Sequence, residues 1–123
     1  MIPDKVKNYY GGGSNFNYKI TYISQSKPLG MAHSISLTEG LVNEDKFTVI
    51  LIDNLISYSI SKFVKMFERS DYDAYLLFSE FSHPQDFRVA KFSLSGKLIG
   101  FVEKAKFPPS NYVIIGIYFF LFL

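Results

Sequence analysis

The sequence contains no cysteine. This excludes a disulfide framework and thiolate metal sites. Its two histidines, His33 and His83, cannot form a zinc site by themselves. The composition therefore fits the reducing cytoplasm, and we expect a cytoplasmic protein.

Neither charge sign dominates. Lys and Arg together number 13, and Asp and Glu number 11, giving a net charge of +2. The charges are scattered along the chain, so no basic stripe favours a nucleic acid or an anionic membrane as partner. Residues 1–6 lack the charged and then apolar layout of a secretory signal. We therefore expect neither export nor a nucleic-acid partner.

No apolar run is long enough to cross a bilayer. The longest apolar stretch, residues 112–123, falls short of the roughly 20 residues that a spanning helix needs. Its β-branched and aromatic residues favour a buried strand, and a membrane-contacting tail is the weaker alternative. Because residues 119–123 end the chain inside an apolar run, we also expect that the reading frame ends prematurely.

A chain of 123 residues with 48% apolar residues predicts one domain, residues 1–123, that buries roughly two-thirds of its unfolded surface. The apolar run 46–52 lacks polar alternation and predicts a central parallel strand covered on both faces. Residues 60–68 predict an amphipathic helix that packs on the sheet. The other predicted elements are a helix end at 4–10, a turn at 11–14, a strand at 18–23, a helix at 28–40, a strand at 75–78, and a hairpin of 87–93 with 97–103 around Gly96. Together they predict an α/β domain with a mixed sheet.

Two polar pairs follow predicted strands. Asp53 and Asn54 follow the buried strand, at the edge where ligands of α/β sheets bind. The Asp53 carboxylate suits Mg²⁺, although a cap on the following turn explains it equally well. Glu103 and Lys104 place an acid and a base where a strand opens to solvent before a Pro-rich bend. The alternative for this pair is a solvated strand end.

Several short motifs, in this order, resemble a sugar-phosphate nucleotidyltransferase of the glucose-1-phosphate thymidylyltransferase type. They are Tyr10-Gly11 with Gly13-Ser14 and Phe16, Lys19-Ile20-Thr21-Tyr22-Ile23 with Gln25, Pro28-Leu29-Gly30-Met31-Ala32, Asp53-Asn54, and Phe101-Val102-Glu103-Lys104 through Ser110-Asn111-Tyr112 to Gly116-Ile117-Tyr118. The resemblance covers residues 9–120. It implies part of a Rossmann-like nucleotidyltransferase sheet, with helices on both faces, from the middle of such an enzyme.

The resemblance also implies a reaction and a set of roles. In that family a sugar 1-phosphate attacks the α-phosphorus of a nucleoside triphosphate, pyrophosphate leaves, and Mg²⁺ offsets the charge. Carried over by position, Gln25 and Gly30 would face the base, with the Gln25 amide favouring a pyrimidine. Asp53 would be a metal ligand. The sugar-phosphate side would comprise Asn54, Glu103, Lys104 and the backbone near Ile114.

The departures from the family pattern concern the charged parts of the site. The family's Gly-rich loop with Thr, Arg and Lys, which cradles the triphosphate, does not occur in these residues, and Gly11-Gly12-Gly13 fits a linker-like turn better. A second metal carboxylate is also missing. Ile52 and Arg88 stand where the family has glycines. The Arg88 side chain either fills the sugar site or points to solvent.

Two functions follow from these observations. The first is a truncated nucleotidyltransferase, inactive alone, that keeps part of a site for a nucleoside triphosphate or nucleoside diphosphate-sugar and for sugar 1-phosphate. The second is a non-catalytic interaction module that pairs its open strands with a full-length relative or with itself. We expect the strands 18–23 and 47–52 each to lose a ladder partner, because the family's intervening strands are missing.

Overall fold

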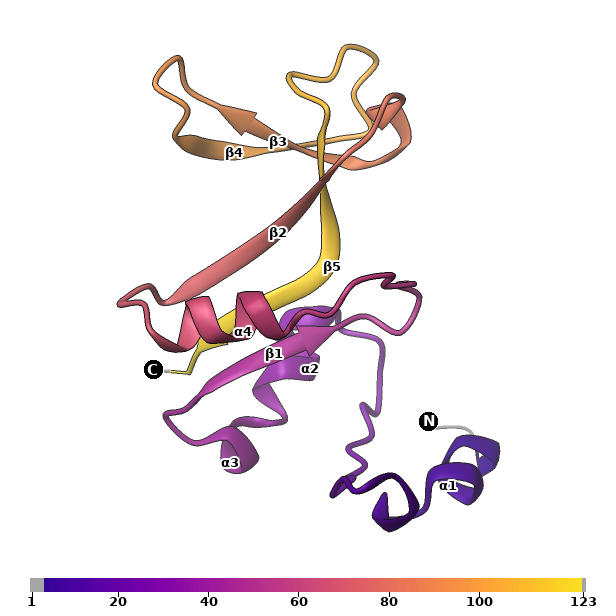
Figure 1. Ribbon diagram of the computed structural model, residues 1–123. Coiled ribbons are helices and arrows are strands. Elements are labelled where there is room, and N and C mark those ends of the chain that lie inside the picture. Colours follow the sequence, from indigo (N-terminus) through magenta and orange to yellow (C-terminus); the bar gives the residue numbers. More distant parts are fainter. Residues whose placement is uncertain (1–3, 123) are drawn as a thin grey trace. The chain divides into compact units, whose positions relative to one another are not determined.

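The computed structural model describes residues 4–122, which form two compact units that divide after Asn43 (Figure 1). Each unit is described by itself. The prediction of a single nucleotidyltransferase-like domain over residues 1–123 remains a prediction.

The first unit is helical. It contains α1 (Asp4–Tyr10), the 3₁₀ turn η1 (Ser14–Phe16), α2 (Met31–Ser36) and α3 (Glu39–Val42). The predicted helix at 4–10 is confirmed, and the predicted helix 28–40 begins later and is divided into α2 and α3. Thr38 lies at the division, where its hydroxyl donates to the Ile35 carbonyl at 2.7 Å. Threonine readily makes such a local bond in competition with helix continuation.

The predicted strand at residues 18–23 is wrong. This described segment forms no ladder, and two of its amides bond to the preceding turn instead. The Tyr18 amide donates to the Gly13 carbonyl at 3.1 Å, and the Ile20 amide donates to the Gly12 carbonyl at 3.0 Å. Gly13 has φ 87°, and a Cβ there would lie 2.5 Å from the Tyr18 carbonyl oxygen. The glycines therefore form a local turn, which agrees with the linker-like interpretation.

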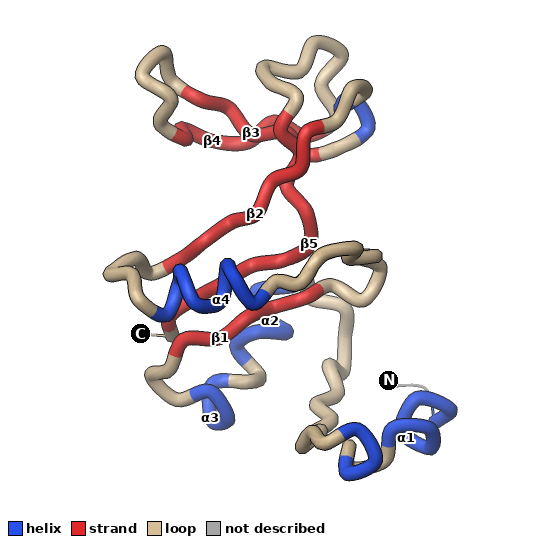
Figure 2. The backbone as a smooth tube through the Cα atoms, viewed as in Figure 1, coloured by secondary structure: helices blue, strands red, loops and turns tan. Residues whose placement is uncertain are grey.

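The second unit contains a five-stranded sheet (Figure 2). Its strands are β1 (Lys46–Ile50), β2 (Ala74–Glu80), β3 (Arg88–Phe92), β4 (Leu98–Glu103) and β5 (Tyr112–Leu121). The path runs β1-β5-β3-β4, and β2 also pairs with β5. The long strand β5 is thus the common neighbour of β1, β2 and β3, which makes it the centre of the unit.

The pairings described for residues 4–122 are all antiparallel. The strand at 46–52 is confirmed as a strand that ends at Ile50, but the prediction of a central parallel strand is wrong, because β1 pairs antiparallel with β5. An apolar run indicates burial and carries no information on the direction of the neighbouring strand. The α/β class and the strands at 75–78, 87–93, 97–103 and 112 onward are confirmed.

Helix α4 (Ser61–Glu68) packs on the sheet through its apolar face, as predicted (Figure 1). Phe67 is buried against Ile117 and Phe119 of β5. Burying a phenylalanine side chain of this kind contributes roughly 1.5–3 kcal/mol. The Lys46 ammonium donates to the carbonyls of Phe67 at 2.7 Å and Ser70 at 2.5 Å. This cation at the helix C-terminus joins α4 to β1.

The remaining connections fix the hairpin and the start of β5. Gly96, with φ 78°, lies in the turn between β3 and β4, and the 3₁₀ turn η2 (Pro84–Asp86) precedes β3. The Ser110 hydroxyl donates to the Ala90 carbonyl at 2.6 Å and accepts from the Tyr112 amide at 3.2 Å. Within residues 4–122, no helix is long and apolar enough to cross a bilayer.

Candidate functional site

Gln25 lies in the first unit within a small hydrogen-bonded group. Its Nε2 contacts the Gly30 carbonyl at 3.3 Å and the His33 Nδ1 at 2.7 Å. Its Oε1 accepts from the Ser34 hydroxyl at 3.3 Å. Gly30 has φ 90° and directly precedes α2, which carries His33 and Ser34. The structure therefore brings together the two residues predicted to face the base, Gln25 and Gly30.

His33 was considered in the sequence only as an insufficient zinc ligand, so its contact with Gln25 was missed. One signal could have placed His33 near Gly30. Residues three apart on a helix share a face, which places His33 beside Gly30 at the start of α2. The contact with Gln25 itself depends on the turn between residues 25 and 30, which local periodicity does not predict.

Asp53 and Asn54 occupy a turn after β1. The Asn54 amide nitrogen Nδ2 donates to the Leu51 carbonyl at 3.1 Å, and the backbone amide of Gly116 donates to the Asn54 Oδ1 at 3.2 Å. A Cβ on Gly116 would lie 2.2 Å from Asn54 Nδ2, so glycine is required for this close approach. Asn54 therefore holds the turn against β5, a structural role that the sequence did not reveal.

Asp53 offers one exposed carboxylate to a metal ion. One of its oxygens, Oδ1, lies 3.3 Å from Asn54 Nδ2, whereas the Asn54 oxygen is already bonded to β5. Across residues 4–122, no group of three or more His, Cys, Asp or Glu side chains could hold a metal. A lone carboxylate fits Mg²⁺ only when water and substrate phosphates supply most of the ligands. Asp53 fits that limited role.

Glu103 and Lys104 lie at the end of β4, beside the first residue of β3. Arg88 is the register partner of Glu103, and its Nε donates to Glu103 Oε2 at 2.6 Å. The pair is exposed, with 59% and 53% of the two side chains accessible. The Arg88 side chain is thus exposed to solvent and at the same time paired with Glu103, and it does not fill an enclosed space. It neutralises the predicted sugar-binding carboxylate.

Lys104 has an unusual backbone. Its φ of 45° lies in the left-handed region, and its amide donates to the Phe87 carbonyl at 3.0 Å. A side chain in this region costs roughly 1–2 kcal/mol. Such strain is often found at functional sites and is maintained by the surrounding contacts. Here the hydrogen bond that follows the β3–β4 ladder holds Lys104 in place.

Strand β5 connects the two polar groups of the second unit. Val113 pairs with Val89, the residue after Arg88. Gly116 bonds to Asn54. Ile114 lies between these two contacts, which are separated by about 10 Å of strand at roughly 3.3 Å per residue. The start of β5 therefore runs from the Arg88 end of the hairpin to the Asn54 turn, with Ile114 between them.

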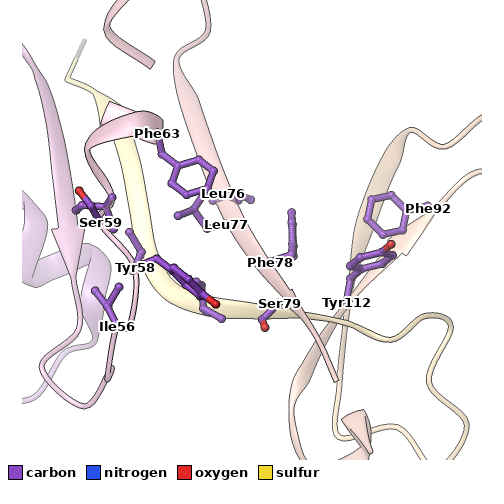
Figure 3. Close-up of a pocket in the computed structure, with 13 residues that line it drawn as sticks. Ile56, Tyr58, Ser59, Phe63, Leu76, Leu77, Phe78, Ser79, Phe92 and Tyr112 are labelled. Atoms are coloured by element: carbon purple, nitrogen blue, oxygen red, sulfur yellow. The ribbon is translucent and has the colours of Figure 1, made fainter. Parts of the chain in front are cut away.

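The second unit also contains a cavity of about 480 Å³ (Figure 3). Its lining is mostly apolar and comprises Ile56, Tyr58, Ser59, Ile60, Phe63, Leu76, Leu77, Phe78, Ser79, Phe92, Tyr112, Ile115 and Ile117. None of the predicted site residues is among these described residues. A cavity lined without carboxylates or cations does not suit a sugar phosphate, so size alone does not mark the site.

The comparison with known proteins settles the family. Residues 2–121 match the family model described as nucleotidyl transferase. The chain belongs to the nucleotidyltransferase family. It is 36% identical over 117 residues to a glucose-1-phosphate thymidylyltransferase of Streptomyces griseus, covering 95% of this chain and 33% of that protein. It is 34% identical to the low-salt glycan biosynthesis nucleotidyltransferase Agl11 of Haloferax volcanii, with the same 95% and 33% coverage.

A solved structure agrees with this assignment. The crystal structure of a glucose-1-phosphate thymidylyltransferase from Bacillus anthracis, in complex with a sucrose, matches with a TM-score of 0.88 at 34% identity. The match covers 96% of this chain and 48% of that one. The nucleotidyltransferase resemblance and the nucleotide-diphospho-sugar transferase fold are therefore confirmed. The chain spans 33% of the length of both curated relatives.

Proposed function

We propose that this chain carries the base and sugar-phosphate parts of a sugar-nucleotide site, and that it does not catalyse turnover alone. The family reaction joins a nucleoside triphosphate and a sugar 1-phosphate into a nucleoside diphosphate-sugar and pyrophosphate. The observation that carries the proposal is the arrangement along β5. Val113 pairs with Val89, which follows Arg88, and the Gly116 amide donates to Asn54 Oδ1. These two contacts on one strand support the assignment of Asn54, Glu103, Lys104 and Ile114 to one sugar-phosphate group.

The base part consists of Gln25 and Gly30. The Gln25 amide can give a pyrimidine one donor and one acceptor. Its bond to the Gly30 carbonyl, at 3.3 Å, is the longer of its two Nε2 contacts. When a base binds, the Nε2 hydrogen that points to the Gly30 carbonyl would donate to a base oxygen instead. The second lone pair of Gln25 Oε1 would accept from the base. Gly30 lets a ligand approach the backbone closely, because it carries no Cβ and nothing lies within 4 Å of the place where a Cβ would be.

The sugar-phosphate part lies on β4 and β5. Lys104 supplies a positive charge for the phosphate, Glu103 accepts hydrogen bonds from sugar hydroxyls, and the backbone near Ile114 lines the sugar. Asn54 holds its turn against β5 in a position to support this group. Asp53 would hold one face of Mg²⁺, which would offset phosphate charge when bound. A thymidine or uridine diphospho-sugar is the ligand that we propose, since the Gln25 amide suits a pyrimidine and the Lys104 ammonium suits a phosphate.

Turnover requires groups that these 123 residues do not supply. The Gly-rich loop with Thr, Arg and Lys would stabilise the charge that develops at the reacting phosphorus. Loss of even one preorganised donor typically costs about 3–4 kcal/mol of transition-state stabilisation. Loss of the whole loop removes several donors together, so we expect binding without detectable product.

Calorimetric titration of the purified chain with thymidine diphospho-glucose, with and without Mg²⁺, tests the proposal. We expect saturable binding that weakens in Glu103→Ala, and whose Mg²⁺ dependence disappears in Asp53→Ala. The matched control is Glu80→Ala, an exposed carboxylate at the end of β2. No heat from a protein that circular dichroism shows to be folded would refute the proposal, as would equal binding by all variants.

The open edge of β1 favours a second candidate function. Within residues 4–122, β1 has one strand partner, β5, so its other edge is unpaired. Beyond the strand, Ile52 and Leu55 are fully exposed, at 97% and 102%. An unpaired edge beside exposed apolar side chains is a template for strand addition. The partner would be a second copy of this chain or a full-length relative.

Light scattering distinguishes this interaction role from a monomeric binder. We expect a dimer at micromolar concentration if β1 pairs with a second copy. Thr48→Pro, which removes a backbone donor and disfavours strand pairing in the middle of β1, should then reduce the dimer, with Thr38→Pro serving as a control outside the sheet. A monomer at all concentrations, with or without a full-length relative, would exclude the second function.

A further inference from the structure

His33 faces the residue that we propose reads the base. Its ring nitrogen Nδ1 lies 2.7 Å from Gln25 Nε2, the shortest contact in the group formed by Gln25, Gly30, His33 and Ser34. An amide nitrogen only donates, so His33 Nδ1 accepts and the ring proton is on Nε2. Both side chains are half-buried. The contact is therefore partly protected from competing water.

The surrounding groups define which way the Gln25 amide points. Its nitrogen faces two acceptors, His33 Nδ1 and the Gly30 carbonyl, and its oxygen faces the Ser34 hydroxyl. Rotation of the amide by 180° would set its oxygen against those two acceptors. The Ser34 hydroxyl could adjust, because it can donate to the Gly30 carbonyl instead, at 3.2 Å. The Gly30 carbonyl has no proton to offer, and His33 could meet the rotated amide only by moving its ring proton from Nε2 to Nδ1.

The direction of the Gln25 amide matters because thymine or uracil and cytosine present opposite hydrogen-bonding patterns. Thymine and uracil offer a donor at position 3 and an acceptor at position 4, whereas cytosine offers an acceptor and then a donor. A fixed donor–acceptor pair matches one pattern and opposes the other. An amide that flips freely would accept both.

We infer that His33 is a positioning residue that fixes the orientation of the Gln25 amide, and that this makes the site select thymine or uracil over cytosine. The inference rests on the proposed function, since it assigns a base to the same site. His33 does not touch the base in this arrangement. It acts through Gln25 by accepting one amide hydrogen and leaving the other for the base.

Two variants of His33 separate positioning from packing. His33→Phe keeps a ring of similar shape and removes the acceptor. His33→Asn restores an acceptor at the same number of bonds from the backbone, because Asn Oδ1 and His Nδ1 are both attached to Cγ. His83→Phe is the matched control, since the other histidine of the chain contacts Ser82 in the second unit.

The experiment is a calorimetric comparison of thymidine, uridine and cytidine diphosphate. We expect the wild-type chain to bind the first two at least about tenfold more tightly than the third, in line with one well-oriented bidentate pair. His33→Phe should bring the ratio close to one, and His33→Asn should restore most of it. An unchanged ratio in His33→Phe, or no recovery in His33→Asn, would overturn the inference while leaving nucleotide binding intact.

A measurement without ligand keeps the two proposals distinguishable. Nitrogen-15 spectra of the free chain should show the His33 proton on Nε2, and a proton on Nδ1 would overturn the inference by itself. If the wild-type chain binds none of the three nucleotides, the proposed function fails and the inference on base selection fails with it. Binding of all three with equal affinity would refute the inference alone.

Discussion

Arg88 and Glu103 are register partners on β3 and β4, and they form an ion pair of 2.6 Å. The pair lies where the family resemblance places a glycine beside the sugar. Arginine is a strong partner for carboxylates because its planar guanidinium presents several donors. A sugar hydroxyl that approaches Glu103 must therefore compete with a charged neighbour. The fold alone does not indicate this competition, because it depends on an arginine at position 88.

The ion pair should contribute little to folding. Because both side chains are more than half exposed, at 59% and 53%, solvent screens the charges. A double-mutant cycle of Arg88→Gln and Glu103→Gln in urea unfolding should give a coupling energy of about 0.2–1 kcal/mol. A coupling above about 2 kcal/mol would mean that the pair is a structural element of the hairpin.

The Asn54–Gly116 contact should contribute more to the free energy of unfolding than the Arg88–Glu103 ion pair. In Gly116→Ala, the new Cβ would lie 2.2 Å from Asn54 Nδ2 and 2.9 Å from Leu51 Cβ, so overpacking should destabilise the chain by about 1–3 kcal/mol. Asn54→Ala leaves the Gly116 amide without its acceptor, which costs about 1–3 kcal/mol. Urea unfolding measures both.

The double variant Asn54→Ala with Gly116→Ala distinguishes overpacking from other effects of replacing the glycine. Removing the Asn54 side-chain amide makes room for the new Cβ. The loss of unfolding free energy in the double variant should therefore be smaller than the sum of the losses in the two single variants. Gly12→Ala is the control, because nothing lies within 4 Å of a Cβ there. Strict additivity would contradict the proposed steric contact.

Lys46 should stabilise the junction between β1 and α4. Its ammonium bonds to the Phe67 and Ser70 carbonyls and lies 4.8 Å from the Phe67 ring centroid. Lys46→Met keeps most of the side-chain length and removes the donors. We expect a loss of about 1–2 kcal/mol in urea unfolding, because a cation at a helix C-terminus is lost together with its hydrogen bonds. Lys62→Met, on the exposed face of α4, should change stability by less than about 0.5 kcal/mol.

The sequence predicted most local elements because they depend on local patterns. The amphipathic period of residues 60–68 and the turn at Gly96 are read from neighbouring residues, and α4 and the β3–β4 hairpin follow them. The segment 18–23 has strand composition but no partner in the described part of the chain. Composition cannot supply a ladder, because strand formation depends on a second strand.

The candidate site residues come from the order of the motifs, which does not predict the contacts that these residues make. The pairing of Arg88 with Glu103 requires the register of a hairpin, which is set by the turn geometry and a shift between Lys91 and Phe92. The contact of Asn54 with Gly116 spans 62 residues. Such a long-range contact follows from tertiary packing and leaves no periodic signal. The contact of His33 with Gln25, eight residues apart, depends on the turn between them.

The affinity of Arg88→Gln for thymidine diphospho-glucose, compared with that of the wild-type chain, is the most direct test of the sugar-phosphate site. Removing the guanidinium frees Glu103 to accept from sugar hydroxyls, so we expect binding about tenfold tighter, since a hydrogen bond to a charged group contributes roughly 1.5–3 kcal/mol. Thymidine diphosphate, which lacks the glucose, should bind the wild-type chain and Arg88→Gln with equal affinity. Weaker or unchanged binding of the sugar nucleotide by Arg88→Gln would contradict the assignment of Glu103 to the sugar.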